Sequence, residues 1–84
     1  MSARILVVDD EEIVRHSCLR ALSDSGHLAE AVPDGAEALA KIQDGRYDVL
    51  VLDIMMPKMD GIEVLRRVKE THPDIEVIMV TGLS

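Results

Sequence analysis

Four short hydrophobic runs divide the chain, and the segments between them carry apolar residues at helical spacing. RILVV at residues 4–8 is rich in β-branched residues and uninterrupted by polar ones after Arg4, as in a strand buried on both faces. YDVLVLD at 47–53 gives the strongest strand pattern, HLAEAV at 27–32 is weaker, and IEVIMV at 75–80 gives the fourth. We therefore predict four strands.

The segments between these strands have the features of amphipathic helices, the first starting near Glu12. Asp34 and Asp60 each precede such a segment and are followed three residues later by a glutamate, the pattern of a capping box at a helix start. Gly26, Gly45 and the His-Pro pair at 72–73 mark helix ends. The apolar stripes expected to face the core comprise Ile13, Val14, Cys18, Ala21, Leu22, Ala36, Leu39, Ala40, Ile42, Ile62, Leu65 and Val68.

Strands and helices alternate along the whole chain, which favours a mainly parallel sheet with helices on both faces. We predict an α/β fold with a doubly wound parallel sheet of the flavodoxin-like type. It would contain four strands in the order 2-1-3-4 and three helices, and it would form one domain over residues 1–84.

The composition narrows the classes of function. A net charge of −7 leaves no basic stripe for a nucleic acid. The single cysteine, Cys18, excludes an internal disulfide, fits a reducing compartment and is expected to be a small core residue. The apolar run at 5–8 is far too short for a signal peptide or a membrane span. We expect a cytoplasmic protein without a membrane or nucleic-acid partner.

Acidic residues follow two strands that the predicted order makes neighbours. Asp9 and Asp10 end the first strand, and Asp53 ends the third. Neighbouring strands lie about 4.8 Å apart, so the three carboxylates would share a cleft where the winding of the sheet reverses. Like charges this close raise one another's pKa or need a cation, and hard oxygen ligands suit Mg²⁺.

Each of these residues also has an ordinary structural explanation. Asp9 and Asp10 could simply precede a helix, whose N-terminus favours acids, and Asp53 could cap a turn. Thr81 and Gly82 follow the fourth strand at the same edge, where a hydroxyl could donate to an anion, but they also suit a plain strand end. The coincidence of acids at two adjacent strand ends is what favours a site.

Three stretches, ILVVDDEE, VLDIMMPKMDG and VIMVTG, occur in this order with helical segments between them. Together they resemble the receiver domain of two-component response regulators, and with the matching elements between them the resemblance covers the whole chain. The resemblance implies a signalling module, not an enzyme acting on an outside substrate. Such a module accepts a phosphoryl group from a phosphohistidine on a sensor histidine kinase and acts through a downstream effector domain or protein, often in transcription regulation.

The resemblance also implies a role for each residue of the acidic cluster. Asp53 would be the phosphoacceptor. Mg²⁺ would be held directly by Asp10 and Asp53, largely through water by Asp9, and by the backbone carbonyl of Met55. The cation would draw charge from the transferring phosphoryl group.

The resemblance ends just after the fourth strand, where Thr81 would hydrogen-bond the phosphoryl oxygens and Gly82 would leave room for their approach. Receiver domains have five strands and five helices, with a lysine at the end of the fifth strand that neither Lys58 nor Lys69 matches. We therefore expect residues 1–84 to be the N-terminal portion of such a domain. Mg²⁺ binding would persist weakly, and phosphorylation would be impaired by the loss of a charge partner.

Three further expectations concern assembly and alternative functions. The strand at 75–80 would lie at an exposed apolar edge, which invites pairing, so we predict a homodimer or a strand-exchanged assembly. A receiver fragment that does not switch and serves only in interaction is the main alternative function. A Mg²⁺-dependent aspartyl phosphatase is a second alternative, but it would want an acid two residues after its nucleophile, where Met55 stands.

Overall fold

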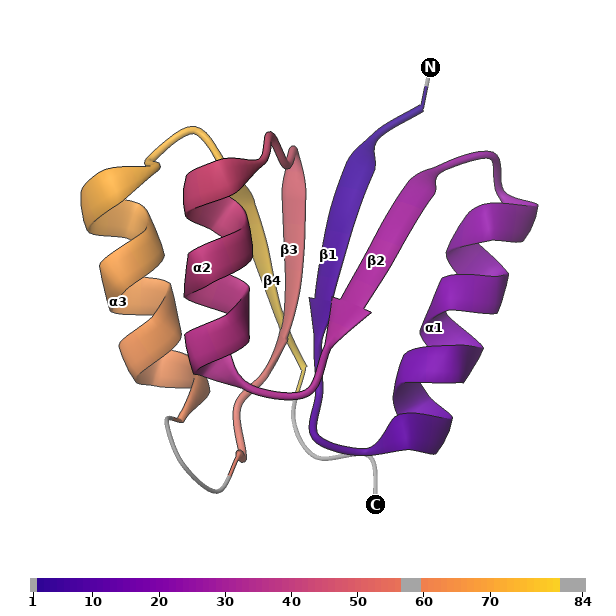
Figure 1. Cartoon of the computed structure of the whole chain (residues 1–84), viewed down its shortest axis with the longest axis horizontal. Coiled ribbons are helices and arrows are strands. Elements are labelled where there is room, and N and C mark those ends of the chain that lie inside the picture. Colours follow the sequence, from indigo (N-terminus) through magenta and orange to yellow (C-terminus); the bar gives the residue numbers. More distant parts are fainter. Residues whose placement is uncertain (1, 57–59, 81–84) are drawn as a thin grey trace.

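The computed structural model describes residues 2–56 and 60–80 of the chain. Its strands are β1 (Arg4–Val8), β2 (Leu28–Val32), β3 (Val49–Asp53) and β4 (Glu76–Val80), and its helices are α1 (Glu12–Asp24), α2 (Gly35–Asp44) and α3 (Gly61–Thr71). The four strands form a parallel sheet in the order β2-β1-β3-β4 (Figure 1). The predicted fold class and strand order are confirmed.

The helices lie on both sides of this sheet. Helices α2 and α3 lie side by side, and α1 lies alone against β2 and β1 (Figure 1). The main core contains fully or almost fully buried aliphatic residues of β1, β3, α2 and α3, among them Leu6, Val8, Ile42, Leu50, Leu52, Val64 and Val68. Each such side chain stabilises the fold by roughly 1.5–3 kcal/mol. This packing fixes the two central strands whose ends carry the acids.

The helix starts predicted at Asp34 and Asp60 are confirmed. The Oδ1 atom of Asp34 accepts a hydrogen bond from the Glu37 amide, and that of Asp60 accepts one from the Glu63 amide, each at 2.9 Å. Within residues 2–56 and 60–80, neither glutamate returns the second bond of a capping box. Glu63 instead forms an ion pair with Arg66 at 2.7 Å, so this part of the prediction is wrong.

Some strand starts also differ from the prediction. β2 and β4 each begin one residue later than predicted, and β3 begins at Val49 instead of residue 47. Tyr47 lies just before β3, where its ring is buried in the core and its hydroxyl donates to Glu30 Oε1 at 3.0 Å. Its hydrophobic character therefore reflects packing of a loop residue.

Several apolar positions expected in the core are exposed. Ile13 and Ile62 have 80% and 57% of their surface exposed. Both lie in the first turn of a helix, next to the edge where the strands end (Figure 1). Ala21, Ala36 and Ala40 are exposed too, and Cys18 is only half-buried. None of the helices in the described part of the chain is long and apolar enough to cross a membrane.

Candidate functional site

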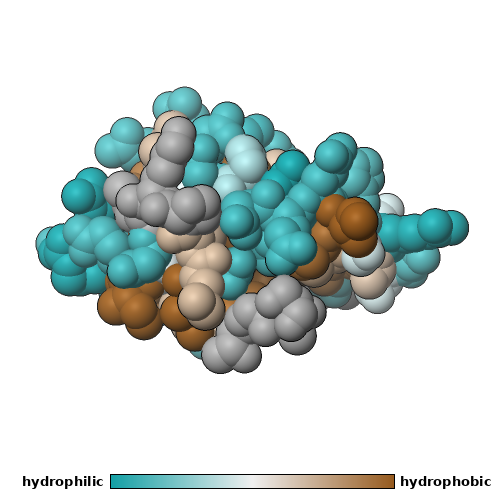
Figure 2. Space-filling view, turned by 90° about the horizontal axis from the view of Figure 1, so that it is seen from below, coloured by the Kyte–Doolittle hydropathy of each residue, from teal (hydrophilic) through white to brown (hydrophobic). Residues whose placement is uncertain are grey.

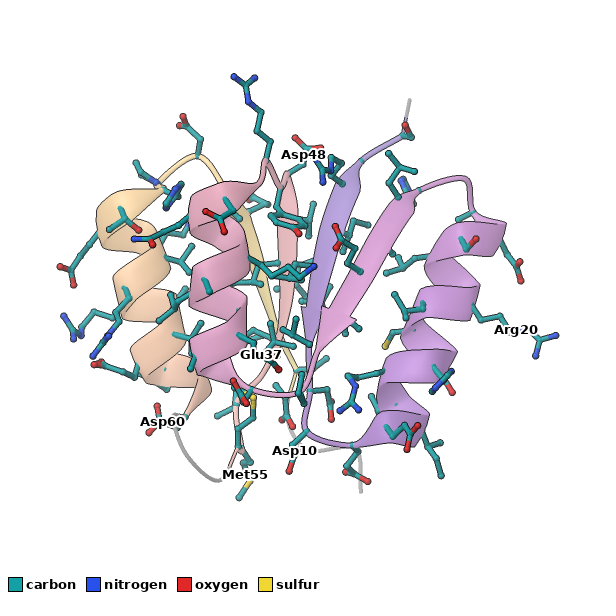
Figure 3. The ribbon with its side chains drawn as sticks, in the orientation of Figure 1. Asp10, Arg20, Glu37, Asp48, Met55 and Asp60 are labelled. Carbon is teal, nitrogen blue, oxygen red and sulfur yellow. The ribbon has the colours of Figure 1, made fainter. Side chains whose placement is uncertain are left out.

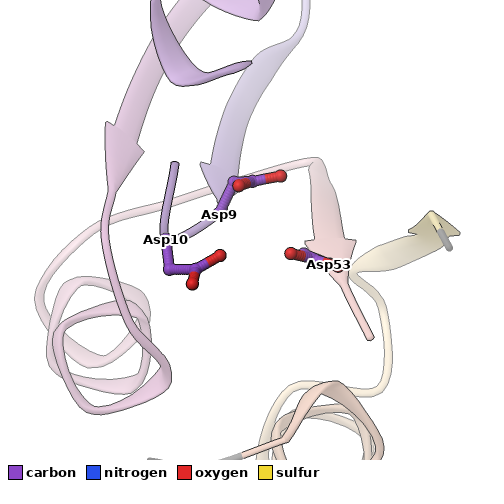
Figure 4. A group of neighbouring side chains, drawn as sticks. All are labelled: Asp9, Asp10 and Asp53. Atoms are coloured by element: carbon purple, nitrogen blue, oxygen red, sulfur yellow. The ribbon is translucent and has the colours of Figure 1, made fainter. Parts of the chain in front are cut away.

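Three carboxylates meet at the edge of the sheet where the strands end. β1 and β3 pair with Val8 opposite Leu52, so the next residues, Asp9 just after β1 and Asp53 at the end of β3, lie side by side. Asp10 turns toward them from the loop after β1 (Figure 4). One carboxylate oxygen from each residue lies within 4.8 Å of the others. The predicted convergence of the three acids is therefore confirmed as geometry.

Backbone contacts hold two of these carboxylates in place. Asp9 and Asp53 are buried, and Asp10 is exposed. The Oδ1 atom of Asp9 accepts a hydrogen bond from the Glu11 amide at 2.9 Å. The Oδ1 atom of Asp53 accepts one from the Met55 amide at 3.1 Å. The loop after each strand thus orients the acid that ends it.

The electrostatics of this cluster favour a cation. Burial raises the pKa of Asp53, the hydrogen bond from the Met55 amide opposes this rise, and the nearby charges of Asp9 and Asp10 add to it. Three converging carboxylates form a set of hard oxygen ligands, which suits Mg²⁺ with part of its shell filled by water. The residues present therefore fit the divalent cation that the sequence predicts.

The start of α3 lies directly against the end of β3. The Gly61 amide donates to the Ile54 carbonyl at 3.0 Å. A Cβ atom on Gly61 would overlap the Asp53 carbonyl oxygen and would stand 2.8 Å from the Ile54 Cα. Sequence reasoning treated Asp60 and Gly61 only as a helix start. The close approach became evident only in the structure, although a glycine directly after an N-cap is a signal that could have suggested it.

A second residue missed by sequence reasoning is Arg15 on α1. Its Nη1 atom donates to the carbonyl oxygen of Asp9 at 2.9 Å, and the side chain is half-buried. Neither hydrophobic periodicity nor the motifs marks this residue. The sequence carries one signal for this contact: the arginine lies one turn inside the helix that comes after the two aspartates.

The remaining predicted site residues lie partly outside the described ranges. Met55 lies at the same end of the molecule as Asp10, and its side chain is 73% exposed (Figure 3). Thr81, Gly82 and Lys58 fall outside the residues that the structure describes. The face seen from this end is hydrophilic over much of its area, with separate apolar patches (Figure 2).

The chain matches the response regulator receiver domain family over residues 5–84. Response regulator MprA of Mycobacterium ulcerans (strain Agy99) is 49% identical over 82 residues, which are 98% of this chain and 35% of that protein. MprA of Mycobacterium tuberculosis (strain ATCC 25618 / H37Rv) is also 49% identical, over 98% of this chain and 36% of that protein. The chain thus spans about a third of the length of these curated relatives.

Solved structures of response regulators are also similar to this chain. Response regulator TrrA of Thermotoga maritima, in complex with Mg²⁺-BeF, is 38% identical with a TM-score of 0.92, over 100% of this chain and 72% of that one. NtrX of Brucella abortus, in complex with ADP, is 38% identical with a TM-score of 0.93, over 100% of this chain and 20% of that one. TrrA has also been solved in complex with the histidine kinase ThkA.

Proposed function

Because this chain belongs to the response regulator receiver domain family, we propose that it is the phosphoacceptor module of a two-component system, with Asp53 as the acceptor. Residues 1–84 would form the N-terminal portion of the receiver domain. The observation that carries the proposal is the buried Asp53 carboxylate at the end of a central strand, beside Asp9 and Asp10. A buried acid beside two others is costly unless it binds something.

The contacts of Asp53 support different roles for its two carboxylate oxygens. Oδ1 accepts a hydrogen bond from the Met55 amide. Within residues 2–56 and 60–80, no donor contacts Oδ2. Oδ2 would therefore attack phosphorus. A bond forms from Oδ2 to phosphorus as the bond from phosphorus to the donor's imidazole nitrogen breaks, and the leaving imidazole keeps the electron pair. Thr81 would donate to the phosphoryl oxygens, with Gly82 leaving room for them.

Mg²⁺ is the proposed cofactor. Asp10 and Asp53 would hold it directly, Asp9 largely through water, and Met55 through its backbone carbonyl. When bound, it supplies positive charge that balances the carboxylates and the transferring phosphoryl group. The clustering of three carboxylate oxygens supports this proposal, and so does the solved complex of the relative TrrA with Mg²⁺-BeF.

The proposed partners are a sensor histidine kinase as phosphoryl donor and an effector domain or protein as recipient of the signal. The solved complex of ThkA with TrrA supports the first, since it pairs a histidine kinase with a response regulator. We place the protein in the cytoplasm, where such a kinase presents its phosphohistidine. Transcription regulation is the output that we propose, as an expectation from the resemblance to response regulators.

A second candidate function, in interaction alone, rests on the exposed edge of the sheet. Among the residues that the structure describes, β4 is the last strand in the order β2-β1-β3-β4, and Ile78 at its centre is 50% exposed. An apolar edge strand with unpaired backbone groups can pair with a second copy of the chain. We therefore propose a homodimer formed by pairing or exchange of β4, which could exist with or without phosphorylation at Asp53.

Transfer from a small phosphodonor tests the acceptor function. The protein is incubated with acetyl phosphate and Mg²⁺, and the intact mass is recorded. One phosphoryl group should appear on the wild type and on Asp44→Asn, which removes an exposed acid at the far end of α2. None should appear on Asp53→Asn or when Mg²⁺ is chelated. Equal incorporation into the wild type and Asp53→Asn contradicts the assignment.

A further inference from the structure

The junction between β1 and α1 is built differently from the starts of the other two helices. Helices α2 and α3 each begin at an aspartate whose side chain caps the helix. At α1 the N-cap is Glu11, and its side chain makes no capping bond. The segment that carries Asp9 and Asp10 must therefore be held by other contacts.

Three contacts fix Asp9 in this junction. Its amide donates to the Val32 carbonyl at 3.2 Å, and its carboxylate accepts from the Glu11 amide at 2.9 Å. Its carbonyl accepts from Arg15 Nη1 at 2.9 Å. That carbonyl belongs to the peptide that joins Asp9 to Asp10. The Arg15 contact therefore fixes the plane of the peptide from which the exposed Asp10 side chain leaves the backbone.

We propose that Arg15 is a positioning residue for the cation site: its bond to the Asp9 carbonyl sets the direction of the Asp10 carboxylate. This inference rests on the proposed function, because it assumes that Asp10 binds Mg²⁺. Without Arg15, the carbonyl loses a charged donor, and the peptide between the two acids is free to rotate. The Asp10 carboxylate would then spend less time facing Asp53.

Substitutions at Arg15 separate its hydrogen bond from its packing. Arg15→Met keeps a long unbranched stem and a similar helix propensity but removes the donor. Arg15→Lys keeps a positive charge and one donor. Arg20→Met removes an arginine of the same helix whose side chain points into solvent (Figure 3). Loss of a residue that orients a metal ligand typically costs about 10-fold or more in affinity.

Titration calorimetry with Mg²⁺, with melting temperatures recorded beside it, tests the inference. Arg15→Met should bind Mg²⁺ about 10-fold more weakly than the wild type, while Arg15→Lys recovers most of the loss and Arg20→Met binds normally. If Arg15→Met does not fold, Arg15→Leu, which also lacks a donor, takes its place. Unchanged affinity in the variant without the donor, or no recovery in Arg15→Lys, overturns the inference. Absence of Mg²⁺ binding by the wild type would instead overturn the proposed function beneath it.

Discussion

Gly61 lies so close to the carbonyl oxygen of Asp53 that no side chain fits between them. The first residue of α3 thereby sets the position of the strand end that carries the candidate acceptor. The Gly61 amide strengthens this contact by donating to the Ile54 carbonyl at 3.0 Å. Helix and acceptor are thus joined by backbone contact, which a single added methyl group would disturb.

Gly61→Ala should therefore damage both stability and the site. The overlap with the Asp53 backbone should lower the free energy of unfolding by roughly 1–3 kcal/mol and weaken Mg²⁺ binding. Gly26→Ala is the matched control, since Gly26 has a φ of +85° but no atom within 4 Å of an added Cβ. It should cost about 1–2 kcal/mol without changing Mg²⁺ affinity. Urea unfolding measures the free energy of unfolding, and calorimetry measures the Mg²⁺ affinity. Equal Mg²⁺ affinity in both variants would refute the coupling between the Gly61 contact and the cation site.

The charge on Asp53 should reduce stability at neutral pH when no cation is bound. Its raised pKa means that the folded protein holds this proton more tightly than the unfolded chain does. This loss of folding stability is present when the pH is above the pKa of Asp53 in the folded protein. It disappears as the pH falls below 3.8, the ordinary pKa of an aspartate. In the presence of a metal chelator at pH 7, Asp53→Asn should melt at a higher temperature than the wild type. The difference in melting temperature should become smaller as the pH is lowered. A wild type that is the more stable protein at pH 7 would contradict this.

Mg²⁺ should make the wild type melt at a higher temperature than Asp53→Asn. A ligand that binds only the folded protein stabilises it by about 2.7 kcal/mol at 100 times its Kd. The melting temperature of the wild type should rise with Mg²⁺ concentration, and that of Asp10→Asn should rise far less because one of the converging ligands loses its negative charge. Asp44→Asn serves as the charge-matched control. Thermal scans across a Mg²⁺ series give the answer, and identical shifts in the wild type and Asp10→Asn would exclude Asp10 as a ligand.

Assembly through the β4 edge can be tested by placing a charge on each edge of the sheet in turn. Ile78 on β4 is 50% exposed, and Leu28 on β2, the other edge strand, is 63% exposed. Ile78→Lys should dissociate the dimer, because charge on an edge strand opposes pairing. Leu28→Lys should leave the dimer intact. Light scattering across a concentration series reports the mass, and a folded wild-type monomer at high concentration would end the proposal.

Much of this molecule follows from local patterns in the sequence. Apolar runs predicted the strands, with the run at 27–32 the weakest, and their alternation with helical segments predicted a parallel sheet. Because parallel strands end at one edge and the predicted order 2-1-3-4 makes the first and third strands neighbours, the positions of Asp9, Asp10 and Asp53 predicted that their carboxylates meet. That prediction needed no knowledge of side-chain packing.

Features that depend on the distance between elements were not predictable in this way. Helical spacing assigned Ile13 and Ile62 to the core, but both lie in first turns next to the end of the sheet and are exposed. The contact of Gly61 with Asp53 depends on how closely α3 approaches β3. The bond from Arg15 to the Asp9 carbonyl depends on how far one side chain reaches back from α1. Periodicity identifies a face of a helix but gives no such distances.

Binding of beryllofluoride, which mimics a phosphoryl group on a carboxylate, tests whether Asp53 is the phosphoacceptor. Fluorine NMR of the protein with beryllium, fluoride and Mg²⁺ should show bound resonances for the wild type and for Asp44→Asn. These resonances should vanish in a chelator and in Asp53→Asn, because Asp53 supplies the oxygen that binds beryllium and the acidic cluster holds the cation. Bound resonances of equal intensity in Asp53→Asn, or none in the wild type, would show that Asp53 is not the phosphoacceptor.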